Sequence, residues 1–136
     1  MQLKRDTDYA LRILYCIGKN FSIKGVVHCG LTLPEICMQS GVPKLAANRL
    51  CEKLLKKGII RSRKRRSETI YYPSGQFKNQ SLLGIIETTE NTAQLFAVFD
   101  KKNGLFRRYG EKLETIQDEI EEVLSNATLK FFIRDE

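Results

Sequence analysis

The first apolar pattern in the chain predicts a helix over residues 6–19. Four apolar residues repeat at the i, i+3, i+4, i+7 spacing that places side chains on one face of a helix. These residues are Ala10, Ile13, Leu14 and Ile17. Asp6 or Thr7 is expected to cap the start of this helix, because short oxygen-bearing side chains accept hydrogen bonds from its first free amides.

Two short helices joined by a tight turn are predicted next. Thr32-Leu33-Pro34-Glu35 has the form of a capping box and starts a helix that runs to about Gln39. Pro43 is expected to start the following helix, and Gly58 to end it in a left-handed conformation. The buried face of this helix is predicted to hold Ala47, Leu50, Cys51 and Leu54. Its outward face is predicted to show Leu45, Asn48, Arg49, Glu52, Lys53 and Lys56.

A run of cations follows, Arg61-Ser62-Arg63-Lys64-Arg65-Arg66. It separates two strand candidates, Ile59-Ile60 and Ile70-Tyr71-Tyr72, so we expect it to form the basic tip of a β-hairpin. Helix pairs of this kind also occur in proteins that do not bind DNA. A basic hairpin directly after the second helix, however, is typical of a winged helix-turn-helix DNA-binding domain.

The charge is divided unevenly along the chain. Residues 1–75 carry 15 Lys and Arg against 5 Asp and Glu, a net +10, whereas residues 76–136 carry 8 against 11, a net −3. A basic front part suits binding to a polyanion, because clustered cations repel one another unless an anion neutralises them. We therefore favour a nucleic acid as the partner over a merely solvated basic face.

The apolar pattern changes after residue 80. Residues 81–87 predict a short apolar helix packed against the base of the wing, and residues 92–100 form a second apolar segment. A long helix follows, with apolar residues spaced alternately by four and three, as in a coiled-coil seam. The seam consists of Tyr109, Leu113, Ile116, Ile120, Val123 and Ala127. Packing within one chain is the alternative, but we favour a homodimer formed through this helix.

Together these patterns predict a mainly α fold with a small β wing. Residues 1–80 would form the winged helix-turn-helix DNA-binding domain, and residues 81–136 a helical linker and dimerisation region. The apolar segments are too short to span a membrane and no secretory signal is visible, so we expect a cytoplasmic protein.

Metal binding and catalysis have little support in the residue inventory. The cysteines are Cys16, Cys29, Cys37 and Cys51. None of them pairs at a C-x-x-C spacing and His28 is the only histidine, so no zinc site of the usual kind is expected. With one histidine and no Gly-rich phosphate loop, no nucleophile–base or metal constellation supports an enzyme.

Four stretches, in this order, resemble the Rrf-two family of bacterial transcription regulators, the group that contains IscR, NsrR and CymR. They are MQLKRDTDYALRILYCI, VPKLAANRLCEKLLKKGII, SLLGIIE and IQDEIEEVLSNATLKFF. The resemblance covers nearly the whole chain. It implies a winged-helix dimer that acts on transcription at palindromic operators, and we expect a repressor.

Site residues follow from matching positions in the resemblance. Asn48 and Arg49 fall where the family's recognition helix meets base edges, and Lys64 or Arg65 falls where a wing cation enters the minor groove. With Arg63 and Arg66 they make up the wing contacts. Phosphate contacts are expected from Lys44, Lys53, Arg61, Arg63 and Arg66.

The chain departs from the family in two places. The wing lacks the family's Gly-rich turn, and residues 80–136 contain no cysteine, so an iron–sulfur cluster of the family type is not expected. Asp8, where some relatives recruit an acidic ligand, is then a carboxylate at a helix start, and His28 with Cys29 is expected to be ordinary loop. The signal stays open among a thiol such as Cys29, a small molecule and a protein effector.

One function other than sequence-specific DNA binding also fits these patterns. A winged-helix module could dock an acidic protein or RNA through its basic wing.

Overall fold

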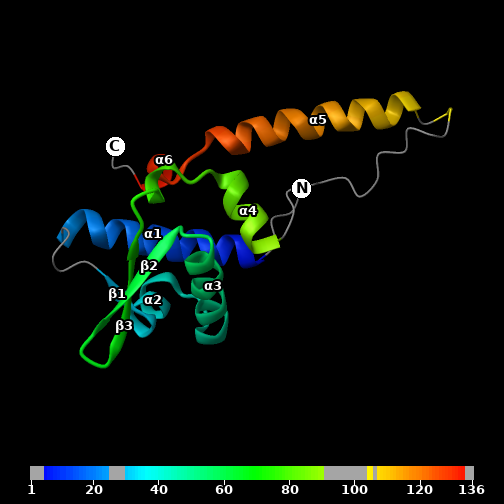
Figure 1. The fold of residues 1–136 in the computed structure, drawn as a ribbon. Helices are drawn as coiled ribbons and strands as arrows, with labels where there is room; N and C mark the ends of the chain where they lie inside the picture. Colours follow the sequence, from blue (N-terminus) through cyan, green and yellow to red (C-terminus); the bar gives the residue numbers. More distant parts are fainter. Residues whose placement is uncertain (1–4, 25–29, 91–103, 106, 134–136) are drawn as a thin grey trace.

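Helix α1 (Arg5–Lys24) lies at the centre of the computed structural model, which describes residues 5–24, 30–90, 104–105 and 107–133. It packs against α2, α3, α4, α6 and strand β3, so most of the fold surrounds it (Figure 1). The predicted apolar stripe is confirmed. Ala10, Ile13, Leu14 and Ile17 are at most 1% exposed.

Both ends of α1 differ from the prediction. The helix starts at Arg5, so Asp6 and Thr7 lie inside its first turn and do not precede it as a cap. Thr7 is fully buried, and its hydroxyl lies 2.7 Å from that of Thr89 on α4 and donates to the Glu90 carboxylate. The helix also continues beyond residue 19, to Lys24. Within it, Gly18 packs so closely on Ile133 that an added Cβ would overlap that side chain.

The predicted helix-turn-helix is confirmed by α2 (Leu33–Ser40) and α3 (Lys44–Lys56). The capping box forms in both directions: the Glu35 amide donates to Thr32 Oγ1 at 3.3 Å, and the Thr32 amide donates to Glu35 Oε1 at 3.1 Å. Gly41 turns the chain at φ 74°, and Gly58 follows α3 at φ 73°. These left-handed conformations favour glycine, which has no Cβ to clash with its own carbonyl.

A three-stranded antiparallel sheet follows the order β1-β3-β2 (Leu31–Thr32, Glu68–Pro73 and Ile60–Arg65). The cations were expected at the hairpin tip, but most of them form β2 itself, whose last pair joins Arg65 to Glu68. Only Arg66 and Ser67 turn the chain, and Arg66 has φ 61°. Because a hairpin can be closed by a two-residue turn, the other cations of the basic run are left to pair with β3.

The C-terminal part joins the core around α1. After the 3-10 turn η1 (Phe77–Asn79) come α4 (Leu82–Glu90), α5 (Arg107–Asn126) and α6 (Leu129–Ile133). Helix α4 was expected on the base of the wing, but it packs mainly on α1, α3 and α5. Its residue Ile85 joins Leu129 and Ile133 in the same core as α1. The domain boundary at residue 80 stays a prediction, and the apolar segment 92–100 lies outside the described residues.

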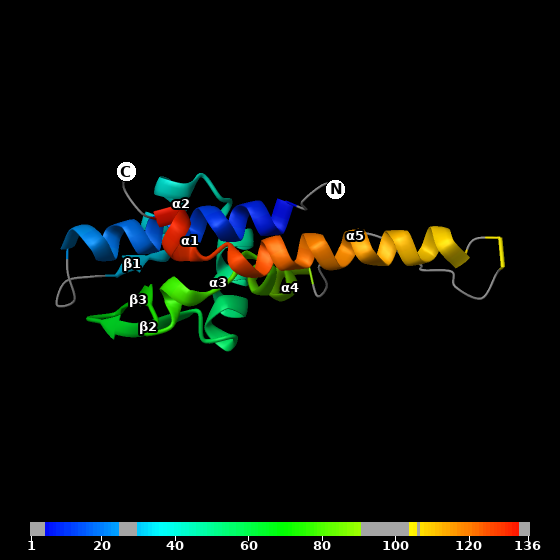
Figure 2. The same cartoon turned by 90° about the horizontal axis from the view of Figure 1, so that it is seen from above.

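Helix α5 projects beyond the start of α1 (Figures 1 and 2). Five of the six predicted seam residues lie in it, but Ala127 lies just past its end. The Ala127 amide still donates to the Val123 carbonyl at 3.2 Å, while its own carbonyl accepts from the Leu82 amide at 2.7 Å. Ala127 therefore helps to tie the end of α5 to the start of α4.

Gly30, directly before β1, gives a test of this packing. Its φ is 137°, and a Cβ built there would lie 2.8 Å from Ile70 Cδ1 and 3.1 Å from Ile70 Cβ. Backbone strain and overpacking should together make Gly30→Ala destabilising by roughly 2–4 kcal/mol in urea unfolding. Gly75→Ala is the control, because a Cβ there meets nothing within 4 Å. Equal unfolding midpoints for the two variants would contradict this packing of β1 on β3.

Candidate nucleic-acid interface

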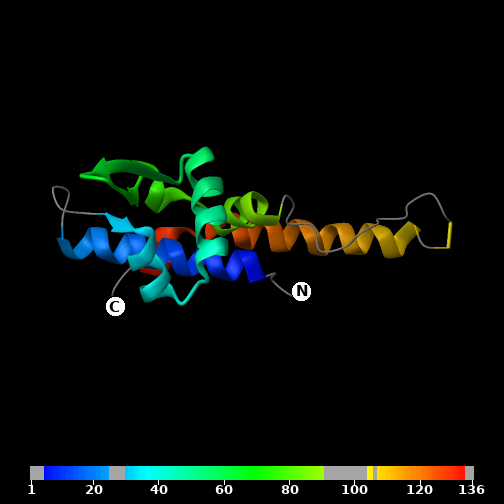
Figure 3. The ribbon, with the colours of Figure 1, turned by 90° about the horizontal axis from the view of Figure 1, so that it is seen from below.

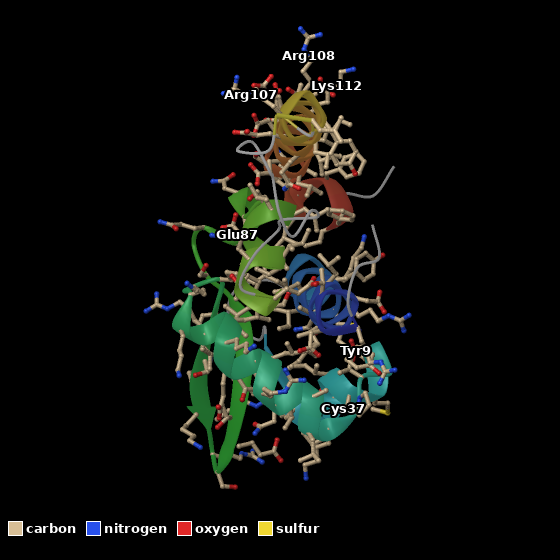
Figure 4. All side chains as sticks on the ribbon, turned by 90° about the vertical axis from the view of Figure 1, so that its right-hand side faces the viewer. Tyr9, Cys37, Glu87, Arg107, Arg108 and Lys112 are labelled. Atoms are coloured by element: carbon tan, nitrogen blue, oxygen red, sulfur yellow. The ribbon has the colours of Figure 1, made fainter. Side chains whose placement is uncertain are left out.

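Helix α3 and the β2–β3 hairpin both lie below α1 in Figure 1, and in Figure 3, seen from below, α3 crosses in front of α1 with the hairpin beside it. Figure 4 shows α5 on the opposite side of α1, with Arg107, Arg108 and Lys112 at its start. The helix-turn-helix and the hairpin thus form one surface, which we call the α3–wing surface. It consists of the outward face of α3 together with residues 61–68.

The outward face of α3 is polar because its other face is used by the core. Ala47, Leu50, Cys51 and Leu54 are fully buried, which turns the remaining positions of the helix outward. The exposed residues are Lys44, Leu45, Asn48, Arg49, Glu52 and Lys56, and Lys53 is half-buried. Leu45 is 87% exposed, so one large apolar side chain stands among these polar groups.

Arg49 forms an ion pair with Asp6, a residue of α1 that lies 43 positions away in the sequence. Arg49 Nη1 lies 2.7 Å from Asp6 Oδ2, and Nη2 donates to Oδ1 at 3.1 Å, so two parallel hydrogen bonds join the side chains. The hydrogen bond from Arg49 lowers the pKa of Asp6 below its ordinary value, and the charges of Arg49, Lys53 and Arg5 act in the same direction. Sequence reasoning missed this pair, because no local signal connects two positions so far apart.

The wing cations are solvent-exposed along β2 and at its turn. Side chains alternate between the two faces of a strand, so Arg61, Arg63 and Arg65 share one face and Lys64 lies on the other. The Arg63 guanidinium lies 5.8 Å from the centre of the Tyr72 ring, and Lys64 Nζ donates to Thr69 Oγ1 at 2.8 Å. The hairpin therefore presents cations on both faces, and two of them, Arg63 and Lys64, contact side chains of β3.

The remaining candidate residues give no metal site in the described part of the chain, where no group of three or more potential ligands occurs. Asp8 pairs with Arg12 one turn along α1, at 3.0 Å between Oδ2 and Nε. His28 and Cys29 lie outside the described residues, so their roles stay predictions. None of the helices in the described ranges is both long and apolar enough to span a membrane.

One cavity bears on a small molecule as the signal, one of the three alternatives that the sequence leaves open. It has a volume of about 350 Å³ and lies where α1, the end of β3, η1 and α6 meet. Phe21, Phe77 and Ile133 line it, together with Lys78 and Lys130. The existence of an effector stays a prediction.

The α2–α3 pair followed by the β2–β3 hairpin defines a winged helix-turn-helix protein. No protein-family model and no curated protein matches this chain in sequence. Three of the solved structures that it resembles are CymR from B. subtilis, a global cysteine regulator, the oxidized form of CymR from Staphylococcus aureus, and IscR from T. potens.

These likenesses extend over whole chains. The B. subtilis CymR match has a TM-score of 0.78 at 18% identity and covers 98% of this chain and 96% of that chain. The S. aureus CymR match has a TM-score of 0.72 at 18% identity and covers 100% of this chain and 98% of that chain. The IscR match has a TM-score of 0.73 at 16% identity and covers 97% of this chain and 86% of that chain. The resemblance to the Rrf-two regulators is thereby confirmed for the fold, while the roles of individual residues stay predictions.

The thiol of Cys51 gives a test of the packing behind α3. Burial raises its pKa to about 12, with a further contribution from Cys37, because a thiolate is poorly solvated in the apolar core. At pH 8 only on the order of one in ten thousand Cys51 side chains would be thiolate, the reactive form. Iodoacetamide should label half-buried Cys37 well before Cys51, as followed by peptide mass spectrometry. Equal labelling rates in the folded protein would contradict the buried position of Cys51.

Proposed function

We propose that this chain is a sequence-specific, DNA-binding transcription regulator that acts as a homodimer at a palindromic operator. One observation carries the proposal: the polar face of α3 and the cationic strand β2 are presented together on one side of the core. The likeness of the fold to CymR and IscR supports the same function.

Helix α3 is the element that would enter the major groove, which is wide enough to admit an α-helix. Asn48 and Arg49 lie on its exposed face, where their side chains would meet base edges. An asparagine can bind adenine, and an arginine guanine, through two hydrogen bonds each. Lys44 and Lys53 would contact phosphates, which position the protein without reading the sequence.

The hairpin would contact DNA beside α3. Its exposed cations are suited to the closely spaced phosphates, and Lys64 or Arg65 would enter the minor groove. Arg61, Arg63 and Arg66 would hold the backbone. Five of the six residues 61–66 are cations, and their mutual repulsion falls when DNA phosphates neutralise them. The wing would therefore contribute mainly to the affinity for DNA and less to the choice of sequence.

Dimerisation would use the projecting helix α5. Tyr109, Ile116 and Val123 recur every seven residues along it and are 61%, 45% and 68% exposed. Leu113 and Ile120 flank this row and are half-buried. An apolar row on an extended helix is stabilised when a second helix covers it. We infer that the second helix comes from another copy of this chain.

A twofold dimer would present two α3–wing surfaces to one DNA duplex. Such symmetry matches a palindromic operator, with half-sites spaced by about one helical turn or a multiple of it. A dimer bound in this way represses transcription by covering promoter DNA, and we propose this mode.

The proposed function is tested by selecting duplexes from a random pool with the purified protein. We expect a shared palindromic motif and binding that weakens steeply with salt, because cations on the protein displace counterions from phosphates. Recovery of no shared motif, with binding of RNA or an acidic protein instead, would favour the docking-module alternative.

Arg49 and Arg66 should differ in what they contribute to binding. Arg49→Ala should relax the preference at one base pair by roughly 1–3 kcal/mol, because it removes a base contact. Arg66→Ala should weaken binding to all duplexes about equally, because it removes a phosphate contact. Gel shifts with the selected and single-substituted duplexes distinguish the two effects. Lys130→Ala, which removes an exposed cation on α6, is the control and should change neither.

Val123→Glu should break the dimer, because it places a charge in the apolar row of α5. We expect the dimer dissociation constant to rise by about a hundredfold or more, measured by sedimentation velocity. Ser125→Glu adds the same charge at an exposed position outside the seam and serves as the control. If both variants remain as dimeric as the wild type, α5 does not carry the dimer interface.

A further inference from the structure

We propose that Asp6 is a specificity-determining residue of the α3–wing surface. In the free protein it would hold Arg49 in an ion pair and release it only where the DNA offers a base edge that replaces both hydrogen bonds. This inference rests on the proposed function and adds a residue on α1 to the machinery that reads the sequence.

The geometry of the pair is the first support. Asp6 faces both terminal nitrogens of Arg49, at 2.7 and 3.1 Å, which is the two-point arrangement of arginine and carboxylate. A guanine presents O6 and N7 in a similar fork. The carboxylate and a guanine edge therefore compete for the same end of the guanidinium.

The second support is the rigidity of the elements that carry the pair. Asp6 lies in the first turn of α1, whose apolar stripe is buried, and Arg49 lies on α3, whose opposite face packs in the same core. The packing of both helices in one core resists a change in the distance between them. The pair can therefore open by movement of the Arg49 side chain alone, which is 48% exposed.

The third support is the charge around Asp6. Arg5, Arg49 and Lys53 all act on its carboxyl, and the pKa of Asp6 is lowered, chiefly by the hydrogen bond from Arg49. Asp6 is therefore ionised at neutral pH, and its carboxylate is in the charged form that pairs with Arg49. On a DNA with the wrong base, Arg49 would stay with Asp6 and add no net charge toward the phosphates.

The consequence is selectivity against random DNA. An unpaired Arg49 would bind any nearby phosphate and so strengthen binding to every sequence. Paired with Asp6, it contributes only where the correct base is present. Asp6→Asn should therefore tighten binding to random duplexes more than binding to the selected duplex.

Asp8 offers a matched control. It lies two residues away in the same turn of α1 and also forms an arginine pair, but its partner Arg12 is on α1 itself, at 3.0 Å. Asp8→Asn removes the same charge without touching α3. The comparison of the two variants separates the Arg49 pair from a general loss of negative charge.

The experiment measures dissociation constants for the selected duplex and a random duplex over a range of salt concentrations. For Asp6→Asn we expect the specificity ratio to fall about fivefold and the salt slope on random DNA to steepen by about one counterion. Asp8→Asn should leave both unchanged. In an Arg49→Ala background, Asp6→Asn should no longer change the ratio, since no arginine remains to be released.

Two results would overturn the proposal. One is that Asp6→Asn behaves as Asp8→Asn does. The other is that it weakens binding to the selected duplex without strengthening random binding, which would mean that Asp6 supports Arg49 on the DNA. Asp6→Ala is a second variant that removes the same pair. The thermal unfolding midpoints of both Asp6 variants, compared with that of the wild type, show whether either of them has a folding defect. If the wild-type protein selects no motif, the proposed function itself fails, which is a distinct outcome.

Discussion

The burial of helix α1 is the constraint on which the rest of the structure depends. Its stripe from Ala10 to Ile17 is shielded from water by α2, α3, α4, α6 and β3 together, so each of these elements is positioned by contact with the same helix. Burying apolar side chains is the main favourable contribution to folding. Because α3 packs on α1 and buries Leu50 and Leu54 in the shared core, its polar positions face outward, on the side where the hairpin also lies.

The same packing holds the cationic hairpin against the core. Ile60 and Ile70 anchor the two hairpin strands in the interior, while the cations between them are exposed. At the other end of the molecule, α4 and α6 join the core and leave α5 projecting. The proposed DNA contacts and the proposed dimer contacts therefore lie on opposite sides of α1, and each can bind its partner without displacing the other.

Several local features were predictable from the sequence, because neighbouring residues determine them. The Thr32–Glu35 capping box, the left-handed Gly58 and the buried face of α3 were all found as expected. Contacts between distant segments were not predictable. Gly18 of α1 packs closely on Ile133, Thr7 is buried against Thr89 inside the first turn of α1, and α4 packs on α1 instead of the wing. The Asp6–Arg49 pair, which joins the outward face of α3 to α1, belongs to the same group.

Two copies of the α3–wing surface are proposed to read one duplex symmetrically, and hydroxyl-radical footprinting on a selected duplex tests this arrangement. We expect two protected half-sites related by twofold symmetry, with centres about 10 base pairs or a multiple of that distance apart. A single asymmetric patch of protection, or uniform weak protection along the duplex, would contradict it.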